Sequence, residues 1–258
     1  MRRVHLLYTV VLFVLILVPI FSMPFTVPTL LNPMIRASTS QSLNWAGYAV
    51  AVEQGSVNSV NGSFVVPQLT CSNKQSYVAL WVGIDGYNDS TVEQTGVLGQ
   101  CSHGMAVYSA WYEFYPSSPV YAPSSDVVKP GDFIYANVSY DASSQKFVTT
   151  LYDKSEGWTY TSHATSVNGA LRSSAEWILE RPAIGGSLTT LANFGTAYYG
   201  EGYTFIQGTN YASIAGSTEP IAFFPYTQIT MVTRGHSSVL ASPSSLTSSG
   251  TSFYVTYG

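Results

Sequence analysis

Two glutamates stand inside strongly apolar, aromatic segments of the chain. Glu113 lies in the segment AWYEFYP and Glu176 lies in the segment AEWILE. A carboxyl group beside aromatic rings is a candidate for a shifted pKa and for general acid–base catalysis. In such chemistry a carboxylate takes the proton of a water molecule as the water attacks a carbonyl carbon. For both residues the plainer interpretation, a glutamate on a solvated strand face, stays open.

If both segments are β-strands, the alternation of side chains decides which residues share a face. Trp111, Glu113 and Tyr115 then point to the same side of the first strand. In the second strand, Trp177 would face the core, so we expect Glu176 to face a sheet surface or a cleft. The two glutamates therefore need a folded sheet to bring them together.

The chain between and around these segments consists of short apolar or alternating runs separated by Gly, Asn, Asp, Ser and Pro. No stretch has a convincing helical period. We expect strands at residues 45–52, 62–66, 77–84, 92–98, 105–115, 133–140, 147–152, 175–179, 188–194, 221–232 and 253–257. Regularly spaced strands are typical of a β-sandwich or jelly roll, so the sequence predicts one all-β domain. The segment 197–225, rich in Tyr and Gly, has no evident partner and is interpreted as a loop that modifies a cleft.

The N-terminal segment is expected to lie outside this domain. Arg2 and Arg3 precede an apolar run over residues 6–21, which is the pattern of a secretory signal peptide. The run is shorter than the ~20 residues of a membrane span, but no small-residue cleavage site follows it, so an uncleaved membrane anchor stays open. We divide the chain into a signal peptide or anchor (1–22), a Pro-rich spacer or short pro-segment (23–43) and the domain (44–258). We therefore expect an extracellular protein, secreted or held at the outer face of a membrane.

Composition narrows the class of protein. Hydrophobic residues make up 46% of the chain and aromatic residues 14%, which is enough for a large core. The formal net charge of −4 gives no basic surplus for binding nucleic acid. Charged residues are only 9% of the chain, so few ion pairs are lost on protonation and self-repulsion in acid is mild. Acid tolerance is one interpretation, and an ordinary polar secreted surface is the other.

The cysteines and the missing motifs limit the chemistry further. Cys71 and Cys101 are the only cysteines, and in an exported chain they are expected to form a disulfide, with two separate buried thiols as the alternative. The sequence contains no HExxH, GxSxG, P-loop or CxxC motif and no metal-ligand spacing. We therefore expect neither a metal nor a cofactor.

A series of segments resembles, in the same order, the glutamic peptidases, or eqolisins. These segments are NWAGYAV (44–50), GSFVVP (62–67), WVGIDG (81–86), EQTG (93–96), AWYEFYP (110–116), GD (131–132), AEWILE (175–180) and FYVTY (253–257). One short match would carry little weight, but the ordered set covers nearly all of the chain after Leu43.

The resemblance implies a fold, an activity and a set of site residues. The fold is an antiparallel β-sandwich of two seven-stranded sheets, like a concanavalin-type jelly roll. The activity is that of a pepstatin-insensitive endopeptidase that cleaves polypeptides at acid pH. Separately from the resemblance, we expect a monomer. The glutamine of the family's QTG motif falls on Gln94 and the glutamate of its AEWI motif on Glu176, as a catalytic dyad. The residues expected to bind substrate are Trp81, Asp85, Trp111, Glu113 and Tyr115.

These residue types suit hydrolysis in acid. A glutamate can still be ionised in moderate acid, where histidine is protonated. A glutamine amide donates hydrogen bonds to an oxyanion at any pH, because it does not titrate. Three alternatives stay open. Trp81 and Trp111 would instead pack in the core. Glu113 and Glu176 would be the carboxyl pair of a glycoside hydrolase. The domain would be a non-catalytic carbohydrate-binding or adhesion module.

Overall fold

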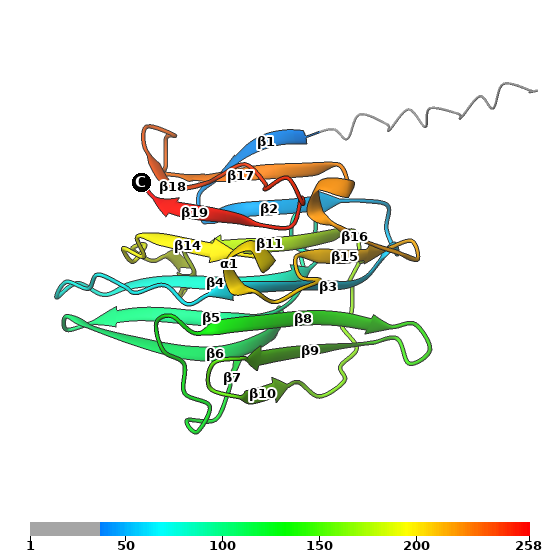
Figure 1. The fold of residues 1–258 in the computed structure, drawn as a ribbon, viewed down its shortest axis with the longest axis horizontal. Helices are drawn as coiled ribbons and strands as arrows, with labels where there is room; N and C mark the ends of the chain where they lie inside the picture. Colours follow the sequence, from blue (N-terminus) through cyan, green and yellow to red (C-terminus); the bar gives the residue numbers. More distant parts are fainter. Residues whose placement is uncertain (1–36) are drawn as a thin grey trace, which may run out of the picture. The chain divides into compact units, whose positions relative to one another are not determined.

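A computed structural model describes residues 37–258, and nearly all of its regular structure is β-strand (Figure 1). The strands are β1 (Ala37–Ser42), β2 (Trp45–Ala51), β3 (Val57–Val65), β4 (Ser76–Ile84), β5 (Val92–Ser102), β6 (Met105–Tyr115), β7 (Val120–Tyr121), β8 (Phe133–Asp141), β9 (Lys146–Asp153), β10 (Trp158–Thr161), β11 (Ser174–Glu180), β12 (Ala183–Ile184), β13 (Ser187–Leu188), β14 (Thr196–Tyr199), β15 (Tyr211–Ile214), β16 (Ser217–Pro220), β17 (Tyr226–Val232), β18 (Val239–Pro243) and β19 (Phe253–Tyr257). The helical elements are α1 (Glu201–Thr204) and the 3-10 turn η1 (Ile221–Phe223). Among these residues no helix is long and apolar enough to cross a membrane.

The strand ladders build two layers that pack face to face. One layer has the order β1, β17, β2, β11, β4, β5, β6 and β7. The other contains β10, β9, β8 and β3, continues through β14, β19 and β18, and carries the β15–β16 hairpin on β3. Every pair of these strands is antiparallel except β1 with β17. Because β18 also pairs with β17, the network is one curled 17-stranded sheet. The predicted all-β sandwich is confirmed, while the count of seven strands per sheet is not.

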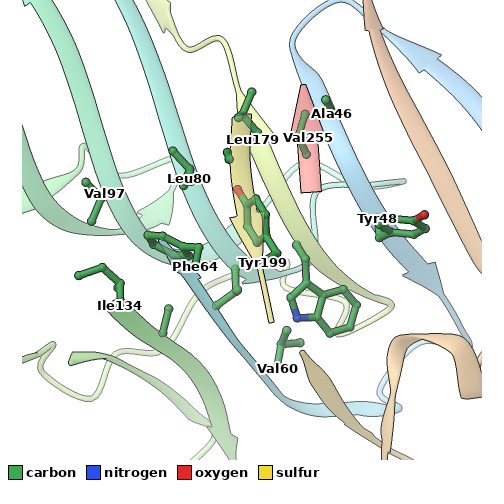
Figure 2. Close-up of a cluster of buried hydrophobic side chains, with 14 of the residues drawn as sticks. Ala46, Tyr48, Val60, Phe64, Leu80, Val97, Ile134, Leu179, Tyr199 and Val255 are labelled. Atoms are coloured by element: carbon green, nitrogen blue, oxygen red, sulfur yellow. The ribbon is translucent and has the colours of Figure 1, made fainter. Parts of the chain in front are cut away.

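The main core lies between the two layers (Figure 2). Phe64, Trp177 and Tyr199 are fully buried there, and burying a side chain of this size contributes about 2–3 kcal/mol. The polar atoms of these rings are satisfied across the layers. Trp177 Nε1 donates to the carbonyl of Asn61 at 2.8 Å, and the Tyr199 hydroxyl donates to the carbonyl of Ile178 at 2.8 Å. The aromatic residues therefore fix how the layers sit on each other as well as filling the space between them.

Two strands show how the local sequence follows from position in the sheet. Along the central part of β8, half-buried and buried residues alternate, because one face meets the core and the other meets solvent. In contrast, β4 lies between β11 and β5 and is buried along almost its whole length, which explains its unbroken run SYVALWVGI. Its second face packs in a smaller cluster with Trp111 and Ile178. This second face is the one that carries the candidate site.

The described chain differs from the sequence-based expectation at several elements. β1 lies within the predicted spacer 23–43. Among the described residues, regular structure therefore starts at Ala37, before the predicted domain boundary at residue 44. The predicted signal peptide or anchor (1–22) lies outside the described residues. Most of the predicted strand 188–194 is irregular. The predicted strand 221–232 begins as the turn η1, and its strand starts only after Pro225, which has no N–H for a ladder.

The segment 197–225 was interpreted as a loop that modifies the cleft, and this is wrong. It holds α1, β15 and β16 and most of β14, and it completes the second layer next to β3 and β19. The disulfide prediction is confirmed, because Cys71 and Cys101 are bonded and join the segment before β4 to the end of β5.

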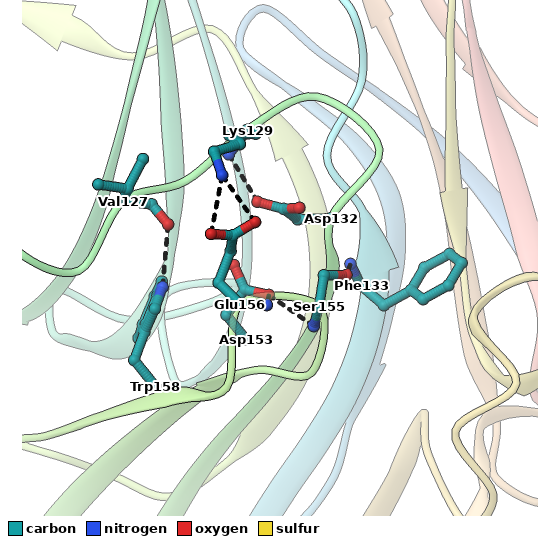
Figure 3. A network of polar contacts seen from close by, with 8 residues as sticks. All are labelled: Val127, Lys129, Asp132, Phe133, Asp153, Ser155, Glu156 and Trp158. Atoms are coloured by element: carbon teal, nitrogen blue, oxygen red, sulfur yellow. Dashed lines mark hydrogen bonds and ion pairs between the residues drawn. The ribbon is translucent and has the colours of Figure 1, made fainter.

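A polar network fixes the turn between β9 and β10 (Figure 3). Lys129 Nζ contacts both carboxylate oxygens of Glu156 at 2.8 Å, and the backbone N–H of Lys129 donates to Asp132 at 2.6 Å. Trp158 Nε1 donates to the carbonyl of Val127 at 2.9 Å. The exposed ion pair adds little by itself, so the hydrogen bonds from Trp158 to Val127 and from the Phe133 N–H to Ser155 also join residues 127–133 to this turn.

Candidate active site

β11 presents two different faces. Trp177 and Leu179 point into the main core, as the alternation predicts. Glu176, Ile178 and Glu180 point to the opposite face, where Ile178 packs in the smaller cluster. Two carboxyl groups therefore lie four residues apart on the same side of one strand.

Gln94 and Glu176 belong to the same row across the sheet. Glu113 pairs with Gln94, Gln94 with Gly83, and Gly83 with Glu176, so these side chains share one face. The Trp81 ring lies over Gly83, because a Cβ atom there would come within 2.9 Å of Trp81 Cζ3. The row needs glycine at this position, and the indole ring separates Gln94 from Glu176.

A cavity of about 530 Å³ opens on this face. Its lining residues are Asn44, Trp45, Tyr77, Ala79, Val92, Gln94, Leu98, Trp111, Glu113, Tyr115, Pro119, Tyr121, Glu180, Pro182, Ala183 and Ile184. The wall is mainly aromatic and aliphatic, and its ionisable carboxyl groups are Glu113 and Glu180. A cavity of this size and chemistry can hold side chains of an extended peptide while presenting carboxyl and amide groups to it.

Glu180 is a carboxyl group held by neutral donors. Trp81 Nε1 donates to Oε2 at 2.9 Å, and Asn44 Nδ2 donates to Oε1 at 3.3 Å. Burial raises the pKa of Glu180, and the hydrogen bonds from Trp81 and Asn44 oppose this rise because they stabilise the carboxylate. Glu180 is also only partly buried, so it can be reached from the cavity.

Gln94 and Glu113 form a hydrogen-bonded pair that lines the same cavity as Glu180. Gln94 Nε2 donates to Glu113 Oε2 at 2.7 Å, while Gln94 Oε1 is buried without a partner. Burial raises the pKa of Glu113 to about 7, with a further rise from the charge of Glu180, and the hydrogen bond from Gln94 partly opposes this. The site therefore holds a carboxyl with a raised pKa, an amide, and a second carboxyl whose ionised form accepts hydrogen bonds from Trp81 and Asn44.

Glu176 does not lie where the sequence suggested. Its side chain is fully buried, neither carboxylate oxygen has a hydrogen-bond partner, and it does not line the cavity. Side-chain alternation correctly predicts that Glu176 points away from the main core. At this row, however, neighbouring side chains such as Trp81 cover that face of the sheet. Burial raises the pKa of Glu176 well above its ordinary value. Its role in a dyad stays a prediction, and the burial of its side chain favours a different glutamate.

The residues expected to bind substrate separate into two groups. Trp111, Glu113 and Tyr115 line the cavity. Asp85 does not: it is fully buried at the end of β4 and accepts backbone N–H groups from Leu171, Arg172 and Ser173 at 2.7–2.8 Å. It ties the segment before β11 to β4.

Trp81 is fully buried and packs edge-on against Trp45, with the ring centroids 5.1 Å apart. Core packing, the alternative kept for Trp81, is therefore part of what this residue does, while its N–H group holds Glu180.

Sequence reasoning missed Glu180, Asn44 and Trp45 as site residues. All three lie inside segments that it had singled out, AEWILE and NWAGYAV. The available signal was the spacing of Glu176 and Glu180, since residues four apart on a strand share a face. A second hollow, of about 400 Å³, is lined by Tyr140 and Arg172 among others, and no carboxyl group of the described residues lines it. Within residues 37–258, no cluster of His, Cys, Asp or Glu is arranged to bind a metal ion.

Comparison with known proteins gives a consistent family. The Peptidase A4 family model matches residues 43–233. Aspergillopepsin-2 of Aspergillus niger is 31% identical over 200 residues, which are 69% of this chain and 68% of that protein.

Solved structures show the same fold. Aspergilloglutamic peptidase from Aspergillus niger matches with a TM-score of 0.60 at 30% identity, over 71% of this chain and 99% of that one. Scytalido-glutamic peptidase with a peptide-based transition-state analogue matches with a TM-score of 0.67 at 21% identity, over 84% and 99% of the two chains. The eqolisin SCP-B, solved with the tripeptide Ala-Ile-His, matches with a TM-score of 0.65 at 20% identity, over 84% and 99%. The chain therefore belongs to the Peptidase A4 family, the glutamic peptidases, and is a protease rather than a glycoside hydrolase or an adhesion module.

Proposed function

We propose that this protease is an exported acid endopeptidase whose working pair is Gln94 and Glu180. The observation that carries the proposal is that Glu180 and Gln94 line one aromatic cavity, whereas Glu176 is enclosed. Peptide-based ligands in the structures of scytalido-glutamic peptidase and SCP-B support polypeptides as the substrates. The N-terminal signal pattern supports export.

In this mechanism Glu180 is first a base and then an acid. As a carboxylate it takes a proton from a water molecule, and the water oxygen attacks the carbonyl carbon of the scissile bond. The Gln94 amide donates a hydrogen bond to the oxyanion of the tetrahedral intermediate. Glu180 then gives its proton to the leaving amine nitrogen, so the carboxylate is restored. The N–H donors Trp81 and Asn44 fit this cycle, because they help Glu180 to ionise in an acid medium.

The proposal is tested by comparing Glu180→Gln with Glu176→Gln. Each purified variant is incubated with a denatured protein at acid pH, with and without pepstatin, and fragments are measured. Glu180→Gln keeps the shape of the side chain but cannot move a proton, so turnover should fall by at least ~10³-fold. Glu176→Gln should keep most of the activity of a folded sample. If Glu180→Gln keeps more than about a tenth of the activity and Glu176→Gln abolishes it, the original dyad of Gln94 and Glu176 is correct instead.

A further inference from the structure

In the proposed mechanism the Gln94 amide donates hydrogen bonds to two acceptors. Its Nε2 group already donates to Glu113 Oε2 at 2.7 Å, and the proposed mechanism needs the same NH₂ group to donate to the oxyanion. Hydrogen bonds to an oxyanion are about 2.7–3.1 Å long, so the oxyanion and the Glu113 carboxyl would lie within about 5 Å of each other. If Glu113 were ionised, two negative charges would compete for one neutral donor group in a cavity with apolar walls.

We propose that Glu113 is a positioning residue that must carry a proton for the site to work, and that loss of this proton ends activity as the pH approaches neutrality. The inference rests on the proposed function of Gln94 and Glu180. A neutral Glu113 accepts one N–H of Gln94 through its carbonyl oxygen and leaves the second N–H for the oxyanion. It fixes the amide without placing a competing charge beside the reaction.

The surroundings of Glu113 are consistent with a carboxyl that holds its proton. The ionisable groups that line the cavity with Glu113 are Glu180 of β11, Tyr115 of β6, Tyr121 of β7 and Tyr77 of β4. Among residues 37–258, no lysine, arginine or histidine lines this cavity. Burial and the negative charge of Glu180 raise the pKa of Glu113 to about 7, and the hydrogen bond from Gln94 opposes this rise.

Glu113 and Glu180 are therefore unequal members of one coupled pair. Glu180 receives hydrogen bonds from Trp81 and Asn44, whereas Glu113 receives one from Gln94. Glu180 ionises first, and its charge then helps Glu113 to keep its proton. The active form has Glu180 ionised and Glu113 neutral. A bell-shaped dependence of kcat/KM on pH follows, with Glu180 on the acid side and Glu113 on the neutral side.

The test is the pH profile of kcat/KM for the wild-type chain and for Glu113→Gln, measured with a blocked peptide that has no ionisable group. Glutamine keeps an acceptor for Gln94 Nε2 and does not titrate. We expect activity at pH 5 within about tenfold of wild type, and a ratio of activity at pH 7 to that at pH 5 at least tenfold higher than in wild type. Profiles that superimpose after scaling would overturn the inference. Samples held at pH 7 and assayed at pH 5 exclude loss by unfolding.

Two controls keep the outcomes separate. If Glu113→Gln does not fold, the carboxyl carbon of Glu113 is followed by NMR in the inactive variant Glu180→Gln. Burial, the main cause of the raised pKa of Glu113, persists there although the charge of Glu180 is gone, so a proton still bound at pH 5 supports the inference and an ionised group at that pH overturns it. Activity that survives in Glu180→Gln would refute the proposed function itself. If kcat/KM of Glu113→Gln falls towards neutral pH just as it does in the wild-type chain, only the role of Glu113 would be refuted.

Discussion

Glu93 gives a direct test of why this chain should prefer acid. Its side chain is fully buried on the core side of β5, and neither carboxylate oxygen has a hydrogen-bond partner. Burial is the main cause that raises the pKa of Glu93 to about 9, and the charges of Asp85 and Asp89 add to it, with the Thr91 hydroxyl opposing weakly. The folded chain therefore keeps a proton on Glu93 that the unfolded chain releases near the ordinary glutamate pKa of 4.5.

The difference between the pKa values of Glu93 in the folded and unfolded chain sets how the free energy of unfolding changes with pH. Because the folded state binds more protons above about pH 4.5, the free energy of unfolding falls as the pH rises through the interval up to about 9. Each pH unit costs about 1.4 kcal/mol, so this one residue removes about 3 kcal/mol between pH 4.5 and pH 7. Glu93→Gln, which cannot ionise, should lose about 3 kcal/mol less over that interval than its parent. At acid pH the variant should be no more stable than the parent, since neutral Glu and Gln are similar in shape and polarity.

The measurement is urea unfolding at pH 4.5 and pH 7, made in the Glu180→Gln background so that the samples do not digest themselves. Glu53→Gln is the matched control, because Glu53 is an exposed glutamate on the loop after β2. The reasoning is refuted if the parent, Glu53→Gln and Glu93→Gln lose the same free energy of unfolding between the two pH values.

Three further outcomes follow from the described contacts. Trp81→Phe removes the N–H donor to Glu180, so the acid limb of kcat/KM should move to higher pH, as a pH–rate profile would show. Replacing both Cys71 and Cys101 by Ser should lower the free energy of unfolding by about 3.5 kcal/mol for a separation of 30 residues, measured in urea. Burial and the neighbouring Asp132 raise the pKa of Asp153 to about 6, so Asp153→Asn should lose less stability than the parent between pH 4 and pH 7, by calorimetry.

Much of the fold follows from the sequence because most strands carry their own pattern. The alternation in β8 indicates a strand with one buried and one solvent-facing side. The unbroken apolar run of β4 indicates a strand buried on both sides. The segment 188–194 was misjudged because Leu191 and Phe194 are buried without joining a named strand. Apolar residues indicate that a segment is buried, but both strands and packed loops are buried. The apolar pattern of 188–194 therefore could not distinguish a strand from a loop.

Part of the candidate site could be predicted from the alternation of side chains along a strand. The sequence places Trp111, Glu113 and Tyr115 on one face, and these residues do line the cavity. It cannot show which stretch of a face is open, because that depends on distant segments. The Trp81 ring covers one part of the face, and Pro119 and Ile184 border another.

The choice between Glu176 and Glu180 is finally a question of hydrogen-bond donors. Both side chains leave β11 on the same face, so alternation alone cannot separate them. A base that works in acid must ionise there, and a buried carboxyl ionises only where donors or positive charges stabilise it. Glu180 has donors in Trp81 and Asn44, whereas Glu176 has no hydrogen-bond partner and only the nearby Ser174 to oppose the effect of burial. Burial therefore raises the pKa of Glu176 well above its ordinary value with little to oppose it, which is why we propose Glu180 rather than Glu176 as the base.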